Sequence, residues 1–349
     1  MATNIKDFAS TPLEAKNYIL DDRINQKIFD QLIVQEKLAH LKDVGHLNDG
    51  VQPVVIFVVG QTGAGKTRLA GDLFGALKAR QPAHFIPDVF KTYHPEYTTI
   101  IKTAPHLASS ATNTDARKWL DQATKWAINR KVDVLIESAC RHPDDFGSLI
   151  SAFHDEGYRT LVALMAVPEC LSLLGTMVRY YKRLPEAQSA NIPLRLTPRK
   201  VHYETYAKFL QDGILAAADF IDNSTTATNV IVVRRNNLVA YQNYPLASID
   251  LERTRPLPAA EHGSFLADYQ YVEEQTSKGG LTEATLADVE ASLAGLMSMG
   301  GRLSASFPAL KPLDVEEWDV NKANLETQDK IETVLPQNSI LEESARVEP

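Results

Sequence analysis

The chain has 349 residues, of which 44% are hydrophobic, and its formal net charge is −8. This length allows one large core or two modest ones, and the acidic balance argues against a nucleic-acid-binding surface. No apolar run approaches the roughly 18 residues of a membrane span, and the first residues, MATN, begin neither a signal peptide nor a myristoylation motif. Cys140 and Cys170 make no disulfide or zinc spacing. We therefore expect a cytoplasmic globular protein with reduced, buried thiols and no membrane partner.

Apolar residues recur at helical spacing from residue 13 to 48, and turn residues follow at 48–50. This pattern predicts an N-terminal helical segment, residues 1–50, packed on the core. From 51 to 245 strand and helix patterns alternate, which indicates βαβ units around a mostly parallel sheet, an α/β fold. We expect strands at 54–59, 84–86, 132–136, 160–167, 230–233 and 238–241, the last two joined in a hairpin around Asn236-Asn237. We expect helices from 67 and at 114–129, 144–156, 172–182 and 199–218.

The remaining residues differ in composition from this domain. Residues 246–311 predict a helical extension, with one helix from Glu283 to Met299 that Thr282 caps. Residues 312–349 form an acidic tail, in which ten acidic and three basic residues leave a net charge of −7. A solvated, partly mobile tail is one interpretation, and a tethered inhibitor that folds over a cationic cleft is the other.

A phosphate-binding motif directly follows the first expected strand. The pattern G-x-x-x-x-G-K-T is formed by Gly60, Gln61, Thr62, Gly63, Ala64, Gly65, Lys66 and Thr67. In this motif the backbone N–H groups surround a polyphosphate, Lys66 supplies a cation for the β and γ phosphates, and the Thr67 hydroxyl can hold Mg²⁺. A glycine-rich turn with a chance lysine is the alternative. The strand before and the helix after favour a P-loop NTPase or kinase fold with three layers.

A carboxylate beyond the second expected strand is the first candidate for catalysis. Asp88 lies twenty-two residues past Lys66, and we expect that strand to neighbour the P-loop strand, so that its carboxyl end overlooks the loop. There Asp88 would accept the proton of an acceptor hydroxyl during phosphoryl transfer. Because Pro87-Asp88 also resembles a helix start, a helix cap is an equal alternative.

Further charged residues follow the third and fourth expected strands. Glu137 at a strand end is a candidate for substrate hydroxyls or for Mg²⁺ through water, and Arg141 is a candidate for a phosphate. Arg179 and Arg195 belong to an arginine cluster that could stabilise a transferring phosphoryl group. Surface salt bridges and a solvated basic face are the alternatives.

Several of these motifs, in this order, resemble the zeta toxins, kinases of the zeta–epsilon type of toxin–antitoxin system. The matching segments are the P-loop 60–67, Asp88-Val89-Phe90-Lys91 with His94-Pro95, Leu135 to Arg141, Met165 to Pro168 with Leu174-Gly175-Thr176 and Arg179-Tyr180, and Arg195 with Thr197-Pro198 and His202. The resemblance covers residues 15–245. It implies that Asp88 is the catalytic base, that Glu137, Arg141 and Asp121 serve the substrate, and that Arg179 and Arg195 contact phosphate.

The resemblance also implies the reaction. Zeta toxins transfer the γ-phosphate of ATP or GTP, with Mg²⁺, to the 3′-hydroxyl of the N-acetylglucosamine unit of a UDP-sugar, and an antitoxin protein is the implied partner. Ala139 stands where the family has a substrate-contacting threonine, Leu149 stands near another, and Asp121 replaces a longer Glu. A kinase with another acceptor, such as another nucleotide sugar, a dinucleotide or an antibiotic hydroxyl, is therefore one alternative. A non-catalytic nucleotide-binding regulator is the other.

Overall fold

A computed structural model describes residues 18–46, 51–104, 107–140, 143–190, 194, 196–206, 213–242, 245–279, 281–300 and 310–314. The chain divides into units 1–313 and 314–349, and the sheet with its helices lies in the first. Apart from Asp314 and the two residues before it, the acidic tail expected at 312–349 lies outside the described residues. Within the described ranges, no helix has the length and apolar character needed to span a bilayer.

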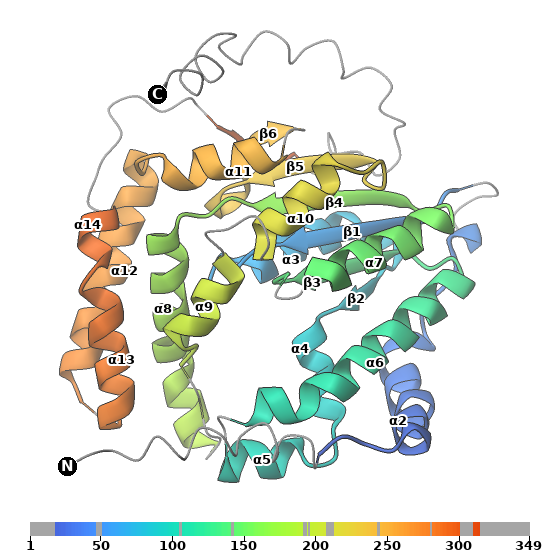
Figure 1. The fold of residues 1–349 in the computed structure, drawn as a ribbon, viewed down its shortest axis with the longest axis horizontal. Helices are drawn as coiled ribbons and strands as arrows, with labels where there is room; N and C mark the ends of the chain where they lie inside the picture. The colour runs from blue at the N-terminus through green and yellow to red at the C-terminus, as the bar shows by residue number, and fades with distance from the viewer. Residues whose placement is uncertain are drawn as a thin grey trace, which may run out of the picture. The chain divides into compact units, whose positions relative to one another are not determined.

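Seven strands of the described chain form one mixed sheet in the order β2-β3-β1-β4-β5-β6-β7 (Figure 1). The first five strands in this order run parallel, and β6 and β7 are antiparallel additions at one edge. Their bounds are β1 Val54–Val59, β2 Ala83–Phe85, β3 Val134–Ser138, β4 Arg159–Met165, β5 Asn229–Val233, β6 Leu238–Gln242 and β7 Lys311–Pro312. The predicted α/β class with a mostly parallel sheet is confirmed.

One expectation about this sheet is wrong. We expected β2 to neighbour the P-loop strand β1, but β3 lies between them, with Val55 paired to Val134 in β3 and Ala83 of β2 paired to the same Val134. The reason is that strand order in a parallel sheet is set by how the crossover helices pack, and the spacing along the chain does not encode it. The ends of β3 and β2 therefore lie side by side, one and two strands from the P-loop.

The first two-thirds of the chain supplies the helices that flank the sheet. Their bounds are α2 Asp22–Ile28, α3 Lys66–Ala76, α4 Pro87–Phe90, α5 Tyr97–Thr103, α6 Ala108–Asn129, α7 Pro143–Asp155, α8 Glu169–Ser189, α9 Arg199–Tyr206 and α10 Gly213–Asp222. The π-helical segment η2 (Phe29–Leu38) continues α2, and 3₁₀ turns lie at η3 Val44–His46, η4 Lys78–Arg80, η5 Lys91–Tyr93 and η6 Arg235–Asn237.

The core forms because both faces of β1 are covered. All six residues of this strand are buried, which is typical of a central parallel strand with helices on either side. On one face, Phe57 meets Phe146 and Phe153 of α7 edge to face, with ring centroids 5.5 and 6.2 Å apart. Helix α3 lies against β1 and β3 and buries Leu69 and Leu73.

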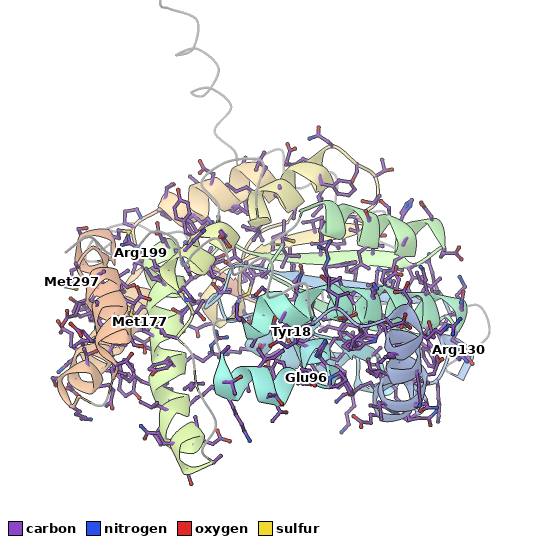
Figure 2. All side chains as sticks on the ribbon, turned by 60° about the horizontal axis from the view of Figure 1, so that its bottom comes forward. Tyr18, Glu96, Arg130, Met177, Arg199 and Met297 are labelled. Carbon is purple, nitrogen blue, oxygen red and sulfur yellow. The ribbon has the colours of Figure 1, made fainter. Side chains whose placement is uncertain are left out.

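The C-terminal extension is helical, as expected, but with more helices. It contains α11 Pro245–Thr254, α12 Ala259–Ser277, α13 Glu283–Leu293 and α14 Leu296–Gly300. The single helix expected from Glu283 to Met299 is broken after Leu293, although Thr282 caps it as predicted by accepting from the Thr285 N–H at 3.3 Å. Figure 1 shows α12 and α13 beside α8, and Figure 2 shows Met297 of α14 near Met177 of α8, in agreement with the contacts between these helices.

A buried ion cluster ties the extension to the end of β5. Arg234 is fully buried, and its guanidinium bonds to Glu252 of α11 at 3.1 Å and to Glu261 of α12 at 3.0 Å. The N–H of Arg234 also bonds to the carbonyl of Leu238, which closes the expected β5–β6 hairpin. Asn236 and Asn237 adopt positive φ in this turn, as their side chains allow.

Other boundaries moved by a few residues. Helix α6 begins at Ala108 and not at 114, α8 continues to Ser189 through Pro185, and β3 runs from 134 to 138 and not from 132 to 136. The helix expected at 199–218 appears as α9 and α10, with residues 207–212 outside the described part. The N-terminal helix expected in 13–48 appears as α2 and η2. Cys140 and Cys170 are buried, and they form no disulfide with each other, as expected.

Candidate functional site

The P-loop between β1 and α3 has the conformation that a phosphate cradle requires. Gly63 and Gly65 adopt φ of 77° and 101°, which side chains rarely tolerate. A Cβ at Gly63 would also lie 1.9 Å from the carbonyl oxygen of Ser172, so this position has no room for a side chain. Gly65 precedes α3 without a side-chain cap, which leaves the helix N-terminus open to an anion.

Lys66 at the start of α3 folds back over this loop. Its Nζ donates to the carbonyl oxygens of Gly60 at 2.8 Å and Gln61 at 3.2 Å. Burial lowers the pKa of the Lys66 ammonium to about 8, although the carboxylates of Glu137 and Asp88 oppose this change. The ammonium is thus desolvated and interacts electrostatically with two acidic side chains.

Glu137 joins the P-loop to the ends of β3 and β2. Only 4% of its surface is exposed, and its Oε2 accepts from the Thr67 hydroxyl at 3.0 Å. Its Oε1 lies 3.1 Å from Nε2 of His84 in β2. Within the described part of the chain, no cluster of three or more His, Cys, Asp and Glu suits a metal. One hydroxyl and one carboxylate do suit Mg²⁺, because this ion keeps several waters and takes its other ligands from substrate phosphates.

Asp88 does not cap a helix. It is the second residue of α4, whose N-cap is Ile86, and its carboxylate accepts from the Lys91 ammonium at 2.7 Å. Partial loss of solvent raises the pKa of the Asp88 carboxyl, but Lys91 and, further away, Lys66 and Arg179 outweigh this effect and hold the pKa below its usual value. The side chain is accessible to solvent and negatively charged at neutral pH.

Arg179 on α8 reaches the same region from the opposite side. Its guanidinium donates to the Thr197 hydroxyl at 3.2 Å. Burial and then Arg183 lower the pKa of Arg179, whereas Asp88 raises it. The mutual effect of Arg179, Asp88 and Lys66 on their pKa values indicates that α8, α4 and the P-loop bring these three charges together.

Of the sequence-predicted residues that the structure describes, Asp121 is not brought into this group. Asp121 lies on an exposed face of α6, where Lys125 Nζ donates to its Oδ2 at 2.7 Å, and the structure does not join it to the P-loop. Arg141 and Arg195 lie outside the described residues. Their predicted roles, like those of Asp88 and Glu137, stay predictions.

Several residues that support the site were not singled out from the sequence. They are His84 behind Glu137, and Ser172, Arg235 and Arg253 behind the P-loop. His202 was noticed only as part of the zeta-toxin resemblance; its Nε2 lies 2.8 Å from the Ser172 hydroxyl, and burial, followed by Arg253, lowers its pKa to about 4. No periodicity or motif marks Arg253, because its partner lies 192 positions away along the chain.

A sequence model of the family described as Zeta toxin matches residues 39–244, more than half of the chain. The chain belongs to the zeta toxin family. Proteins named Toxin zeta from Enterococcus hirae and Streptococcus pyogenes are 27% and 28% identical to it, over 50% and 43% of this chain and 60% and 51% of theirs. The chain thus matches between half and three fifths of the length of these curated relatives. Toxin PezT of Streptococcus pneumoniae is 27% identical over 37% of this chain and 51% of its own.

A solved structure of the PezAT chromosomal toxin–antitoxin system of Streptococcus pneumoniae has the same fold. Its TM-score is 0.59 at 16% identity, and the match covers 75% of this chain and 97% of that chain. The part matched by the zeta toxin family model contains the P-loop, Asp88, Glu137 and Arg179, whereas helices α11 to α14 lie beyond it.

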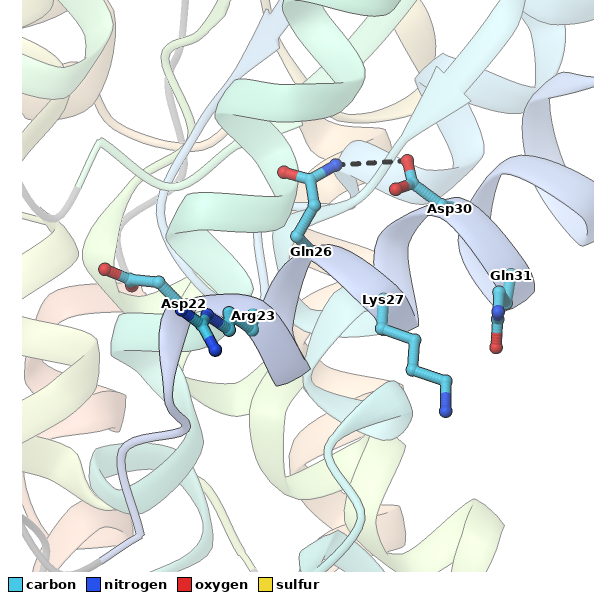
Figure 3. Close-up of a pocket in the computed structure, with 6 residues that line it drawn as sticks. All are labelled: Asp22, Arg23, Gln26, Lys27, Asp30 and Gln31. Carbon is cyan, nitrogen blue, oxygen red and sulfur yellow. Dashed lines mark hydrogen bonds between the residues drawn. The ribbon is translucent and has the colours of Figure 1, made fainter.

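Residues of the P-loop line neither of two hollows in the described surface. One of them, about 470 Å³, is lined by Asp22, Arg23, Gln26, Lys27, Asp30 and Gln31, all from the continuous helical segment α2–η2 (Figure 3). Gln26 bonds to Asp30 there, and no second element contributes polar groups. A second hollow of about 350 Å³ lies between η2, the edge strand β2 and α4.

Proposed function

We propose that this protein is a zeta-type toxin kinase that transfers the γ-phosphate of ATP or GTP to a hydroxyl of a nucleotide sugar. The observation that carries the proposal is the P-loop with positive φ at Gly63 and Gly65, over which Lys66 folds back. Asp88 and Arg179 interact electrostatically with the same ammonium. A protein that only binds nucleotide has no need of a solvent-accessible carboxylate at this place. Membership of the zeta toxin family supports the same activity.

Each residue has a distinct part in the proposed transfer. The N–H groups of the P-loop and the Lys66 ammonium bind the β and γ phosphates, and Arg179 neutralises charge on the transferring group. The acceptor oxygen forms a bond to the γ-phosphorus while the bond to the β-phosphate oxygen breaks, and the hydroxyl proton passes to Asp88. Because the pKa of Asp88 lies below its usual value, this carboxyl is ionised at neutral pH and its oxygens are available to the hydroxyl proton.

Thr67 and Glu137 are the residues that fit Mg²⁺. Their side-chain oxygens lie 3.0 Å apart beside the helix N-terminus, and the Thr67 oxygen retains lone pairs for a metal. Bound Mg²⁺ would neutralise phosphate charge during transfer. His84 would hold Glu137 in place through the other carboxylate oxygen.

For the acceptor we propose the 3′-hydroxyl of the N-acetylglucosamine unit of UDP-N-acetylglucosamine, with Glu137, Asp121 and Arg141 serving the substrate and Arg195 a phosphate. Such a kinase would act in the cytoplasm. Ala139, in place of a threonine expected from the resemblance, and Leu149, near the place of another, reduce the hydrogen bonds available to a sugar. A related nucleotide-linked hydroxyl is therefore the second candidate acceptor.

We further propose that an antitoxin protein is the partner. The solved structure similar to this chain is described as a toxin–antitoxin system, and the relatives are named toxins. If the activity is toxic, expression of the wild-type protein should arrest bacterial growth, and Lys66→Ala should relieve the arrest. Growth that continues in cells that contain the acceptor would contradict the toxin role.

The acceptor is tested by incubating the protein with Mg·ATP and a panel of nucleotide sugars and dinucleotides, followed by mass spectrometry. We expect UDP-N-acetylglucosamine to gain one phosphoryl group. Asp121→Asn should raise the acceptor KM while leaving ATP affinity unchanged, and Asp155→Asn, an exposed carboxylate on α7, serves as the matched control. If only another compound of the panel is phosphorylated, the proposed acceptor is refuted, but the proposed kinase activity still holds.

A further inference from the structure

The side chain of the P-loop residue Gln61 points into the protein and is held there by three groups. It is fully buried, and its Nε2 donates to the carbonyl of Val167 at 2.6 Å and to the Ser172 hydroxyl at 3.1 Å. Its Oε1 accepts from the guanidinium of Arg253 at 2.8 Å. Both ends of this amide are therefore fixed, the oxygen by a cation from outside the family region.

Arg253 comes from α11, beyond the residues that match the family. Besides its bond to Gln61, the guanidinium donates to the carbonyl of Tyr206 at 2.6 Å and lies 4.1 Å from the centroid of the Tyr206 ring. Only 8% of Arg253 is exposed. Burial lowers the pKa of Arg253 to about 10, so the side chain is still charged at neutral pH.

Gln61 connects Arg253 to Lys66 through its side chain and its backbone carbonyl. The backbone carbonyl of Gln61 is one of the two acceptors for the Lys66 ammonium, at 3.2 Å. Because the Gln61 side chain is fixed at both ends, its peptide carbonyl is fixed as well, and with it the resting position of Lys66. Loss of Arg253 would leave the buried oxygens of Gln61 and Tyr206 without this charged donor.

A second arginine, Arg235, also holds the P-loop backbone in place. Arg235 donates to the carbonyl of Gly63 at 2.8 Å, and Asp268 of α12 lies 3.9 Å from the same guanidinium. A Cβ at Gly175 would come within 2.3 Å of Arg235, so glycine there leaves room for this contact. The extension thus approaches the P-loop at Gln61 directly and at Gly63 through Arg235.

We propose that Arg253 is a positioning residue of the phosphate site, acting through Gln61, and that α11 is a working part of nucleotide binding in this chain. This inference rests on one part of the proposed function, namely that the P-loop binds ATP. It does not depend on which hydroxyl compound is the acceptor, and the ATP-binding part of its test needs none.

The test compares Arg253→Met and Arg253→Lys with Lys278→Met, which removes an exposed cation from the same extension. Binding of a fluorescent ATP analogue is titrated without acceptor, acceptor KM is measured separately at saturating ATP, and melting temperature monitors folding. We expect Arg253→Met to weaken ATP binding by about tenfold, as for one charge-assisted hydrogen bond, with acceptor KM changed less than about twofold. Arg253→Lys should recover part of the loss, and Lys278→Met should bind like the wild type.

A double variant distinguishes an effect of Arg253 through Gln61 from a general effect of Arg253 on folding stability. If Arg253 acts through Gln61, Arg253→Met should add little to the loss caused by Gln61→Met. ATP binding within twofold of wild type in Arg253→Met, or equal losses for ATP and acceptor, would overturn the proposal. Should Arg253→Met not fold, unchanged ATP binding in Arg253→Lys would overturn it. Wild-type protein that binds the analogue but phosphorylates no acceptor would contradict the proposed function alone.

Discussion

Asp88 and Lys66 have pKa values shifted in the same direction for opposite reasons. Lys66 loses water, which disfavours its charge, and its pKa falls to about 8. Asp88 is accessible to solvent and faces cations, which favour its charge. A carboxylate and an ammonium are thus both charged at neutral pH within one site, as acceptance of a proton and binding of a phosphate require.

Replacing Asp88 tests the role of the base. Asp88→Asn should leave ATP affinity unchanged, because the P-loop is untouched, and should lower kcat by about 10² to 10⁴, the usual contribution of a positioned base. The measurements are steady-state kinetics and ATP titration. Asp22→Asn, on the surface of α2, is the matched control. A loss in kcat below tenfold with normal acceptor binding would assign Asp88 a structural role.

The lowered pKa of Lys66 predicts a pH dependence of ATP binding. In the free protein the ammonium loses its proton as pH rises through about 8, and bound phosphate favours the charged form. The Kd for ATP should therefore be flat from pH 7 to about 8 and rise above it, by up to about tenfold per pH unit. Titrations with an ATP analogue between pH 7 and 9.5 provide the measurement. A Kd that is constant to pH 9.5 would contradict a desolvated Lys66.

The motif residues could be predicted from the sequence because their spacing is set by local backbone geometry. A strand, a glycine-rich turn and a helix start specify where Lys66 and Thr67 lie. Arg253 and Ser172 could not be predicted, since their contacts with Gln61 join distant segments. Asp121 was assigned from the resemblance alone, and in the structure it pairs with Lys125 on the surface of α6.

At the level of elements, the sequence pattern predicts which segments are strands, but it does not predict their order in the sheet. Alternating apolar runs predicted every strand but β7, and the Asn236-Asn237 pair predicted the β5–β6 hairpin. The position of β3 between β1 and β2 follows from tertiary packing. Helix α12 was not predicted because it lacks a clear apolar pattern. Few of its described side chains are buried, and one of these is the charged Glu261.

The buried Arg234 cluster should control how firmly the extension is attached. Arg234→Met leaves the carboxylates of Glu252 and Glu261 buried without this partner, which should cost about 3–5 kcal/mol in unfolding free energy. Lys125→Met, which breaks an exposed pair, should cost less than about 1 kcal/mol. Urea unfolding followed by circular dichroism measures both. Equal, small losses would show that the cluster does not anchor α11 and α12.

At the scale of the molecule, the described chain is a P-loop sheet, and its C-terminal helices contact the P-loop from behind through Arg253. The fold class followed from the sequence because each strand and helix carries its own periodicity. The packing of the C-terminal helices against the sheet could not be predicted from periodicity. It depends on buried contacts that Arg234 and Arg253 make with residues on other elements.

The most direct measurement is phosphorus NMR of the protein mixed with Mg·ATP and UDP-N-acetylglucosamine. The proposed transfer predicts a new phosphomonoester signal that grows in step with ADP and couples to the proton on C3 of the amino sugar. Lys66→Ala should abolish both signals. Conversion of ATP to ADP and inorganic phosphate only, or no consumption of ATP, would contradict transfer to this sugar by the Lys66–Asp88–Arg179 site.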